Sequence, residues 1–133
     1  MFITARQFGT PLFYNRPDGS TRDNVWGNNI VGLRGNDNFK NPEVVAANKF
    51  RRAMHGQAES VAYSTDDKVA VVSRGNRGAA VVNLSADELP ISVATTLKNG
   101  KYRDVVYGTQ FTVKKGILTG TVKPLTTYVL QSK

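Results

Sequence analysis

The pattern of hydrophobic and polar residues changes at about residue 60. Beyond it, short runs rich in Val, Ile, Leu and Tyr alternate with turn-forming residues, which is typical of an antiparallel β-sandwich or Greek-key sheet. The predicted strands span residues 61–63, 69–73, 79–84, 91–97, 102–107, 110–113, 117–122 and 126–130. We therefore expect a mostly β fold with antiparallel strands.

Short glycine-containing segments separate several of these strands. Gly75–Gly78 and Lys115–Gly116 have the composition of tight turns. Asn99–Gly100 is a two-residue hairpin signal, because both residue types tolerate positive φ angles. We expect these segments to link strands that follow each other along the chain.

The first 60 residues contain one apolar strand-like run, a long loop and one helix. Phe2–Phe8 is expected to be the end of a helix that Gly9 terminates. Pro11–Tyr14 is a short apolar run, and the turn residues Pro17–Gly19 close it. From there to Asn41 the chain is rich in Gly, Asn and Asp, which predicts an irregular loop.

A helix is predicted from Asn41 to His55. Asn41 is a natural N-cap, Pro42 suits the first turn, and Glu43 complements the positive end of the helix dipole. Apolar residues follow at three- and four-residue spacing, namely Ala46, Ala47, Phe50, Ala53 and Met54. One strand and one helix would leave apolar faces uncovered, so this half of the chain looks like a piece of a larger structure.

Composition narrows the class of protein. With 133 residues, 40% of them hydrophobic, the chain can bury the core of one domain. The absence of cysteine excludes disulfides and thiolate metal sites. No apolar run is long enough to cross a bilayer, so we expect no membrane partner. No secretory signal is visible near Met1, and the cellular location stays open.

The net charge of +8, from 18 Lys and Arg against 10 Asp and Glu, raises the question of a polyanion partner. The basic residues gather only in pairs, such as Arg51–Arg52, Arg74 with Arg77, and Lys114–Lys115. This scatter favours a solvated basic surface over a nucleic-acid interface.

Seven segments carry a family resemblance, in the same order along the chain. They are Thr10–Pro17, Trp26–Asn28, Gly32–Phe39, Pro42–Arg51, Val71–Leu84, Asn99–Asp104 and Gly116–Val122. Together they resemble alpha-amylases of glycoside hydrolase family 13, in particular the secreted enzymes of Gram-positive bacteria. The resemblance covers nearly the whole chain and implies that it corresponds to the C-terminal portion of such an enzyme.

The resemblance implies two structural parts. Residues 1–60 would be a remnant of the catalytic (β/α)8 barrel: the end of its seventh helix, its eighth strand, a long loop and its eighth helix. Residues 61–133 would be domain C, the β-sandwich that follows the barrel. The missing barrel portion is then the expected partner of this chain.

The resemblance also implies that the chain carries no catalytic residue. Retaining glycoside hydrolases use one carboxylate as nucleophile and a second carboxyl group as acid, and barrel enzymes hold such groups on loops after several strands. In alpha-amylases these two and a third acidic residue follow the fourth, fifth and seventh strands, so none has a counterpart here. The calcium expected in a full-length parent would also bind outside this segment, and we expect no cofactor within it.

The chain offers no evident substitute for the missing groups. Acidic residues of the first half have turn, loop or helix-start roles: Asp18, Asp23, Asp37 and Glu43. Asp66–Asp67 is too small a cluster for calcium, which takes six or more oxygen ligands. His55, the single histidine, suits the negative end of a helix dipole better than a catalytic triad.

Trp26 and Tyr14 are the candidate substrate-binding residues, because aromatic faces stack on the apolar C–H surface of sugar rings. In the parent family the loop after the eighth strand borders the substrate cleft, which would place Trp26 at its edge. The alternative is a tryptophan that only anchors this loop on the barrel. Strand packing is the simplest role for Tyr102, Tyr107 and Tyr128.

Two functions follow from the sequence. In the first, the chain is a part of an alpha-amylase whose full-length parent hydrolyses α-1,4-glucosidic bonds of starch or glycogen, and it is inactive alone. In the second, it is a non-catalytic β-domain that binds starch or another polysaccharide. A nucleic-acid binder is the least supported alternative, because the sequence has no recognised motif for it.

Overall fold

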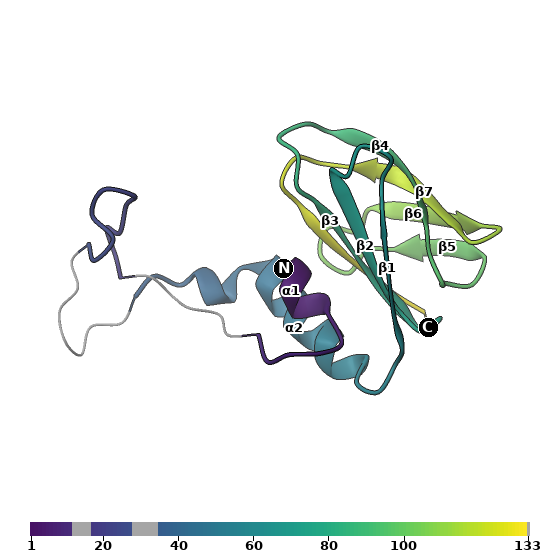
Figure 1. The fold of residues 1–133 in the computed structure, drawn as a ribbon, viewed down its shortest axis with the longest axis horizontal. Coiled ribbons are helices and arrows are strands. Elements are labelled where there is room, and N and C mark those ends of the chain that lie inside the picture. The colour runs from purple at the N-terminus through teal and green to yellow at the C-terminus, as the bar shows by residue number, and fades with distance from the viewer. Residues whose placement is uncertain (12–16, 28–34, 133) are drawn as a thin grey trace.

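The structure is a computed structural model, and it describes residues 1–11, 17–27 and 35–132. Its main body is a pair of four-stranded antiparallel sheets that enclose a hydrophobic core. Two α-helices pack on the outer side of one sheet (Figure 1). The expected antiparallel β-sandwich is confirmed.

The eight strands divide equally between the sheets. The first sheet has the order β1-β2-β3-β8, with β1 (Glu59–Tyr63), β2 (Val69–Arg74), β3 (Gly78–Asn83) and β8 (Thr127–Gln131). The second has the order β4-β7-β6-β5, with β4 (Leu89–Ala94), β5 (Gly100–Arg103), β6 (Gln110–Lys114) and β7 (Ile117–Val122). Because β5, β6 and β7 pair in succession and β4 lies beside β7, the second sheet is a Greek key.

Each predicted strand overlaps an observed one, and the largest differences are at two ends. The predicted strand 91–97 stops at Ala94, and the predicted strand 102–107 stops at Arg103. Residues 104–107 form a turn instead, because Asp104 turns back and accepts hydrogen bonds from the N–H groups of Val106 and Tyr107.

The main hydrophobic core lies between the two sheets. Its buried members are Val69, Val71, Ala79, Val81, Ile91, Val93, Leu97, Tyr102, Phe111, Val113, Leu118, Val122, Tyr128 and Leu130. Along β6, buried and exposed positions alternate, so only one face of the second sheet is covered there. The alternation of apolar and polar residues in this half of the chain is therefore explained by a sheet that has one face exposed to solvent.

The first sheet is covered on both faces. Every residue of β2 and β3 is buried. Side chains that point away from the main core, including Val72 and Ala80, join a second cluster with Ala5, Phe50 and Met54 of the helical layer. The continuous apolar runs in these strands follow from this double burial.

The helical layer consists of α1 (Phe2–Ala5), the short 3-10 helix η1 (Asn38–Lys40) and α2 (Pro42–Ala53). The predicted start of α2 is confirmed, since the Oδ1 atom of Asn41 accepts a hydrogen bond from the Glu43 N–H at 2.9 Å. The predicted helix end at Phe8 and Gly9 is wrong. The chain leaves the helix at Arg6, where the backbone is extended, because Gln7 exchanges hydrogen bonds with Glu59 of β1.

Two of the three predicted turns are confirmed. Residues 75–77 link β2 to β3, and Lys115–Gly116 links β6 to β7 with positive φ angles of 53° and 75°. The hairpin predicted at Asn99–Gly100 is wrong. Strands β4 and β5 do not pair, because β4 pairs with β7 and β5 with β6, so this segment crosses between non-neighbouring strands.

The strand predicted at Pro11–Tyr14 lies mostly outside the described residues. Residues 17–27 form local turns, in which the Ser20 N–H donates to Pro17 O at 3.2 Å and the Thr21 N–H to Asn24 O at 2.9 Å. In Figure 1 these residues lie away from the sandwich. No helix in the described part of the chain is long and apolar enough to span a bilayer.

The close approach of α2 to β3 depends on Gly78. A Cβ atom at this position would lie 2.8 Å from Phe50 Cε2, 3.0 Å from Leu130 O and 3.1 Å from Met54 Sδ. We expect Gly78→Ala to lower the free energy of unfolding by about 2 kcal/mol, because the helix must move outward. Urea unfolding measures this. Ser92→Ala on the exposed face of β4 is the control and should change stability by less than about 0.5 kcal/mol; equal effects would contradict the prediction.

Candidate functional site

One buried guanidinium joins the helical layer to the first sheet. Arg74, the last residue of β2, is 2% exposed. Its Nη1, Nη2 and Nε atoms donate to Ala5 O at 3.2 Å, Met54 O at 3.0 Å and Gln57 O at 3.2 Å. Burial lowers the pKa of Arg74; Glu59 opposes this shift and Arg51 adds to it. The side chain stays charged and connects the ends of α1 and α2 to one strand.

Two further side chains hold residues 6–9 in place beside Arg74. Glu59, 11% exposed at its side chain, accepts from Arg6 Nε at 2.8 Å and from the Gln7 N–H at 2.6 Å. Arg51 of α2 donates through Nη1 to Arg6 O at 2.5 Å and through Nη2 to Gly9 O. The chain that leaves α1 is therefore fixed by both β1 and α2.

At the opposite end of α2, a buried carboxylate organises the turn after β5. Asp104 is 3% exposed. Its Oδ2 atom accepts from the N–H groups of Val106 at 3.1 Å and Tyr107 at 2.5 Å, and its Oδ1 atom accepts from the Val129 N–H at 2.7 Å. This turn is thereby attached to β8 in the other sheet.

Glu43, in the first turn of α2, completes this junction. Its Oε1 atom accepts from the Tyr107 hydroxyl at 2.6 Å, and its Oε2 atom accepts from the Thr127 N–H at 3.0 Å. The hydrogen bond to Glu43, with burial, raises the pKa of Tyr107 to about 12. The Tyr107 ring also lies edge-on to Tyr128, with centroids 5.9 Å apart.

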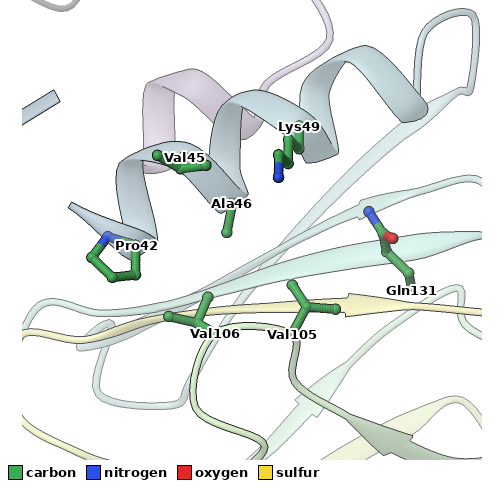
Figure 2. A pocket seen from close by; sticks show the side chains of 7 residues that line it. All are labelled: Pro42, Val45, Ala46, Lys49, Val105, Val106 and Gln131. Carbon is green, nitrogen blue, oxygen red and sulfur yellow. The ribbon is translucent and has the colours of Figure 1, made fainter. Parts of the chain in front are cut away.

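A groove of about 340 Å³ lies between α2, the turn after β5 and the end of β8. Figure 2 shows Pro42 and Ala46 of the helix pointing toward Val105 and Val106, and Val45, Lys49 and Gln131 also line the groove. Its walls are mainly apolar, and none of these lining residues is acidic. The groove can therefore receive an apolar group, but it holds no carboxylate that could act on a glycosidic bond.

The described part of the chain does not show a site formed by the predicted substrate-binding residues Trp26 and Tyr14. Trp26 is 65% exposed in the local turns of residues 17–27. Tyr14 lies outside the described residues. Their sugar-binding role stays a prediction.

The acidic residues and His55 form no cluster in the described part of the chain that could hold a metal ion. His55 and Asp23 are exposed, and Asp18 and Asp37 line a shallow hollow with Gly35 and Asn36. Asp66 accepts from the Ser64 hydroxyl at 2.6 Å in the β1–β2 turn, which lowers its pKa.

The most consequential polar residues were not found from the sequence. Arg74 was expected in a solvated basic pair with Arg77, and this is wrong, because Arg74 is buried against three carbonyls. One feature of the sequence could have indicated that Arg74 is buried: it directly follows the apolar run of β2. If that strand is covered on both faces, its last residue is buried as well. Asp104 and Glu43 gave no such signal, since their partners lie 25 and 84 residues away.

No protein-family model matches the sequence. Curated relatives do match it along its length. The alpha-amylase of Butyrivibrio fibrisolvens is 38% identical over 138 residues, covering 98% of this chain and 14% of the relative. The alpha-amylase of Clostridium acetobutylicum is 33% identical over 133 residues, covering 98% of this chain and 16% of the relative. The chain is therefore similar, over nearly its whole length, to a part of these alpha-amylases.

Solved structures of alpha-amylases show the same fold. Wild-type alpha-amylase I from Eisenia fetida superposes with a TM-score of 0.66 and 18% identity, covering 98% of this chain and 34% of that chain. An alpha-amylase from Anoxybacillus superposes with a TM-score of 0.51 and 19% identity, covering 68% of this chain and 22% of that chain. The chain thus corresponds to a part of an alpha-amylase and spans about one sixth or less of its curated relatives.

The guanidinium of Arg74 should be essential for the stability of this alpha-amylase segment. Arg74→Met keeps the apolar part of the side chain but leaves three carbonyls without their donors. We expect the free energy of unfolding to fall by about 3 kcal/mol, which denaturant unfolding measures. Arg77→Met, at an exposed arginine of the same hairpin, is the matched control. A loss no larger than that of the control would show that these bonds do not stabilise the fold.

The hydrogen bond between Tyr107 and Glu43 gives a pH-dependent test. In Glu43→Gln, the pKa of Tyr107 should fall from about 12 toward its ordinary value of 10. Because the folded pKa is raised, the stabilisation from this bond is fully present below pH 10 and is lost as the pH rises through 12. The pKa is measured from phenolate absorbance as the pH is raised. The difference between this titration and that of the Tyr107→Phe variant gives the contribution of Tyr107 alone. An unchanged pKa in Glu43→Gln would contradict the assignment.

Proposed function

We propose that the chain is a non-catalytic, C-terminal part of an alpha-amylase whose whole enzyme hydrolyses α-1,4-glucosidic bonds of starch or glycogen. In this proposal residues 1–60 belong to the catalytic barrel and residues 61–133 form domain C. The proposal rests chiefly on the match of two alpha-amylases to 98% of this chain, while the chain spans only 14–16% of them. The remainder of the enzyme would be the partner and would supply the reacting groups.

The contacts of the acidic residues support a non-catalytic role. Retaining glycoside hydrolysis needs two carboxyl groups about 5 Å apart that face a cleft. Glu59, Glu43 and Asp104 instead accept hydrogen bonds from donors of this same chain at both carboxylate oxygens. These three carboxylates are occupied in structural contacts.

The packing supports a role in holding the end of the barrel. The second hydrophobic cluster buries Phe50 of α2 and its C-cap residue Met54 against β2, β3 and β8, and Arg74 joins both helices to the sheet. Domain C would thus fix the last barrel helix from outside. Side chains left exposed on the helical layer, including Ile3 at 71% and Val45 at 36%, would be covered by the rest of the barrel.

Trp26 is proposed to lie at the edge of the substrate cleft of the whole enzyme, together with Tyr14. Its exposure of 65% leaves the aromatic face available for a sugar ring. This role depends on the barrel, since the described contacts of residues 17–27 are local.

A chimeric enzyme tests the proposal. The matching segment of the Butyrivibrio fibrisolvens alpha-amylase is replaced by this chain, and the release of reducing ends from soluble starch is measured. We expect activity within about tenfold of the native enzyme, because the reacting groups come from the barrel. The pure chain should release none. Turnover by the pure chain, or a chimera that folds without activity, would contradict the proposal.

Variants of the chimera separate the proposed roles. Arg74→Met should lower the temperature at which activity is lost, whereas Arg77→Met should leave it unchanged. Trp26→Ala should raise KM for starch and leave thermal inactivation unchanged. If Trp26→Ala changed only the thermal inactivation, Trp26 would be a loop anchor.

A further inference from the structure

A second hollow, on the other end of α2 from the apolar groove, has a different chemical character. It has a volume of about 270 Å³ and is lined by Gln7, Phe8, Arg51, His55, Gly56 and Arg74. Three of these residues carry or can carry positive charge, and none is acidic. We refer to it as the arginine pocket.

The guanidinium groups of the arginine pocket have more donors than acceptors around them. Arg74 has five N–H groups, and its three hydrogen bonds to carbonyls leave two, one on each Nη atom. Arg51 donates to Thr4 O at 3.5 Å, Arg6 O at 2.5 Å and Gly9 O, which also leaves two of its five N–H groups. Within the described part of the chain, four guanidinium N–H groups are therefore available.

The other polar lining groups add donors as well. Gln7 uses its Oε1 atom to accept from the Glu59 N–H at 3.1 Å, so the end of its amide that stays available is the NH2 group. His55 is exposed just past the end of α2 and carries two donors when it is protonated. The polar lining is thus composed of groups that can donate to an acceptor.

The charge around the arginine pocket is not balanced by the protein. Glu59 is the carboxylate that counters Arg74, but its two oxygens already accept from Arg6 Nε and the Gln7 N–H. Arg51 and Arg74 repel each other, and the charge of Arg51 contributes to the lowered pKa of Arg74. A bound anion would reduce this repulsion and accept the remaining N–H groups.

We propose that the arginine pocket binds a phosphate group, either as inorganic phosphate or as the phosphate of a sugar ester. Planar guanidinium groups donate pairs of parallel hydrogen bonds to tetrahedral oxyanions, and a phosphate offers several acceptor oxygens for them. Phe8, 79% exposed at the pocket wall, gives an apolar surface on which the carbon skeleton of a sugar ester can lie. This site is separate from any site of starch hydrolysis and does not depend on the proposed function.

The test is a titration of the pure chain by isothermal calorimetry and by the NMR signals of the arginine side chains. The titrants are inorganic phosphate and a hexose phosphate, with chloride at matched ionic strength as the blank. Saturable binding of phosphate that shifts the Arg51 and Arg74 signals supports the proposal. Tighter binding of the hexose phosphate, weakened by Phe8→Ala, would identify a sugar ester as the ligand. The absence of saturable binding of both would overturn it.

Three variants locate the binding. Arg51→Gln should weaken phosphate binding roughly tenfold, because one charge-assisted donor set is lost. His55→Glu, at an exposed residue, should abolish binding by placing a carboxylate at the pocket while leaving the fold intact. Arg52→Gln removes the same charge from an exposed neighbour that does not line the pocket, and it should leave binding unchanged. Equal weakening by Arg51→Gln and Arg52→Gln would mean a diffuse charge effect and would overturn the proposal.

Discussion

The hydrogen bonds from Arg74 to the carbonyls of Ala5, Met54 and Gln57 determine how the helical layer sits on the sandwich. Burying a guanidinium is costly unless its donors are used, and here three of the five N–H groups donate to backbone carbonyls, two of which lie at the ends of the helices. The negative ends of the helix dipoles add to the attraction. Because the same side chain extends from β2, the two helices and the sheet share one polar contact as well as one apolar cluster.

The N-terminal end of α2 is held by the opposite charge. Glu43 bonds to Tyr107 and to the Thr127 N–H, while Asp104 ties the turn of Tyr107 to Val129 of β8. A cation therefore holds one end of α2 and carboxylates hold the other, as the helix dipole favours. Under the proposed function, the sandwich is a rigid support for the last barrel helix, and Glu43 and Asp104 are committed to that support.

Local patterns predicted most of the fold. The strand runs, the cap at Asn41 and the turn at Lys115–Gly116 depend on residues close in sequence, and these are confirmed. The Asn99–Gly100 hairpin failed because Greek-key pairing is decided by contacts between distant strands. Arg74 and Asp104 could not be assigned for the same reason, since their partners are brought together only when the helices meet the sheets. The family resemblance, in contrast, was visible in the sequence because it lies in many short segments.

The central claim is that the helical layer and the sandwich form one cooperative body. Native-state hydrogen exchange tests it most directly, by comparing the amides of Ala47 and Phe50 in α2 with those of Ala80 and Val81 in β3. The account predicts the same free energy of opening for both sets, because Arg74 and the second cluster must break together. Opening of α2 at a free energy lower by more than about 2 kcal/mol would contradict it.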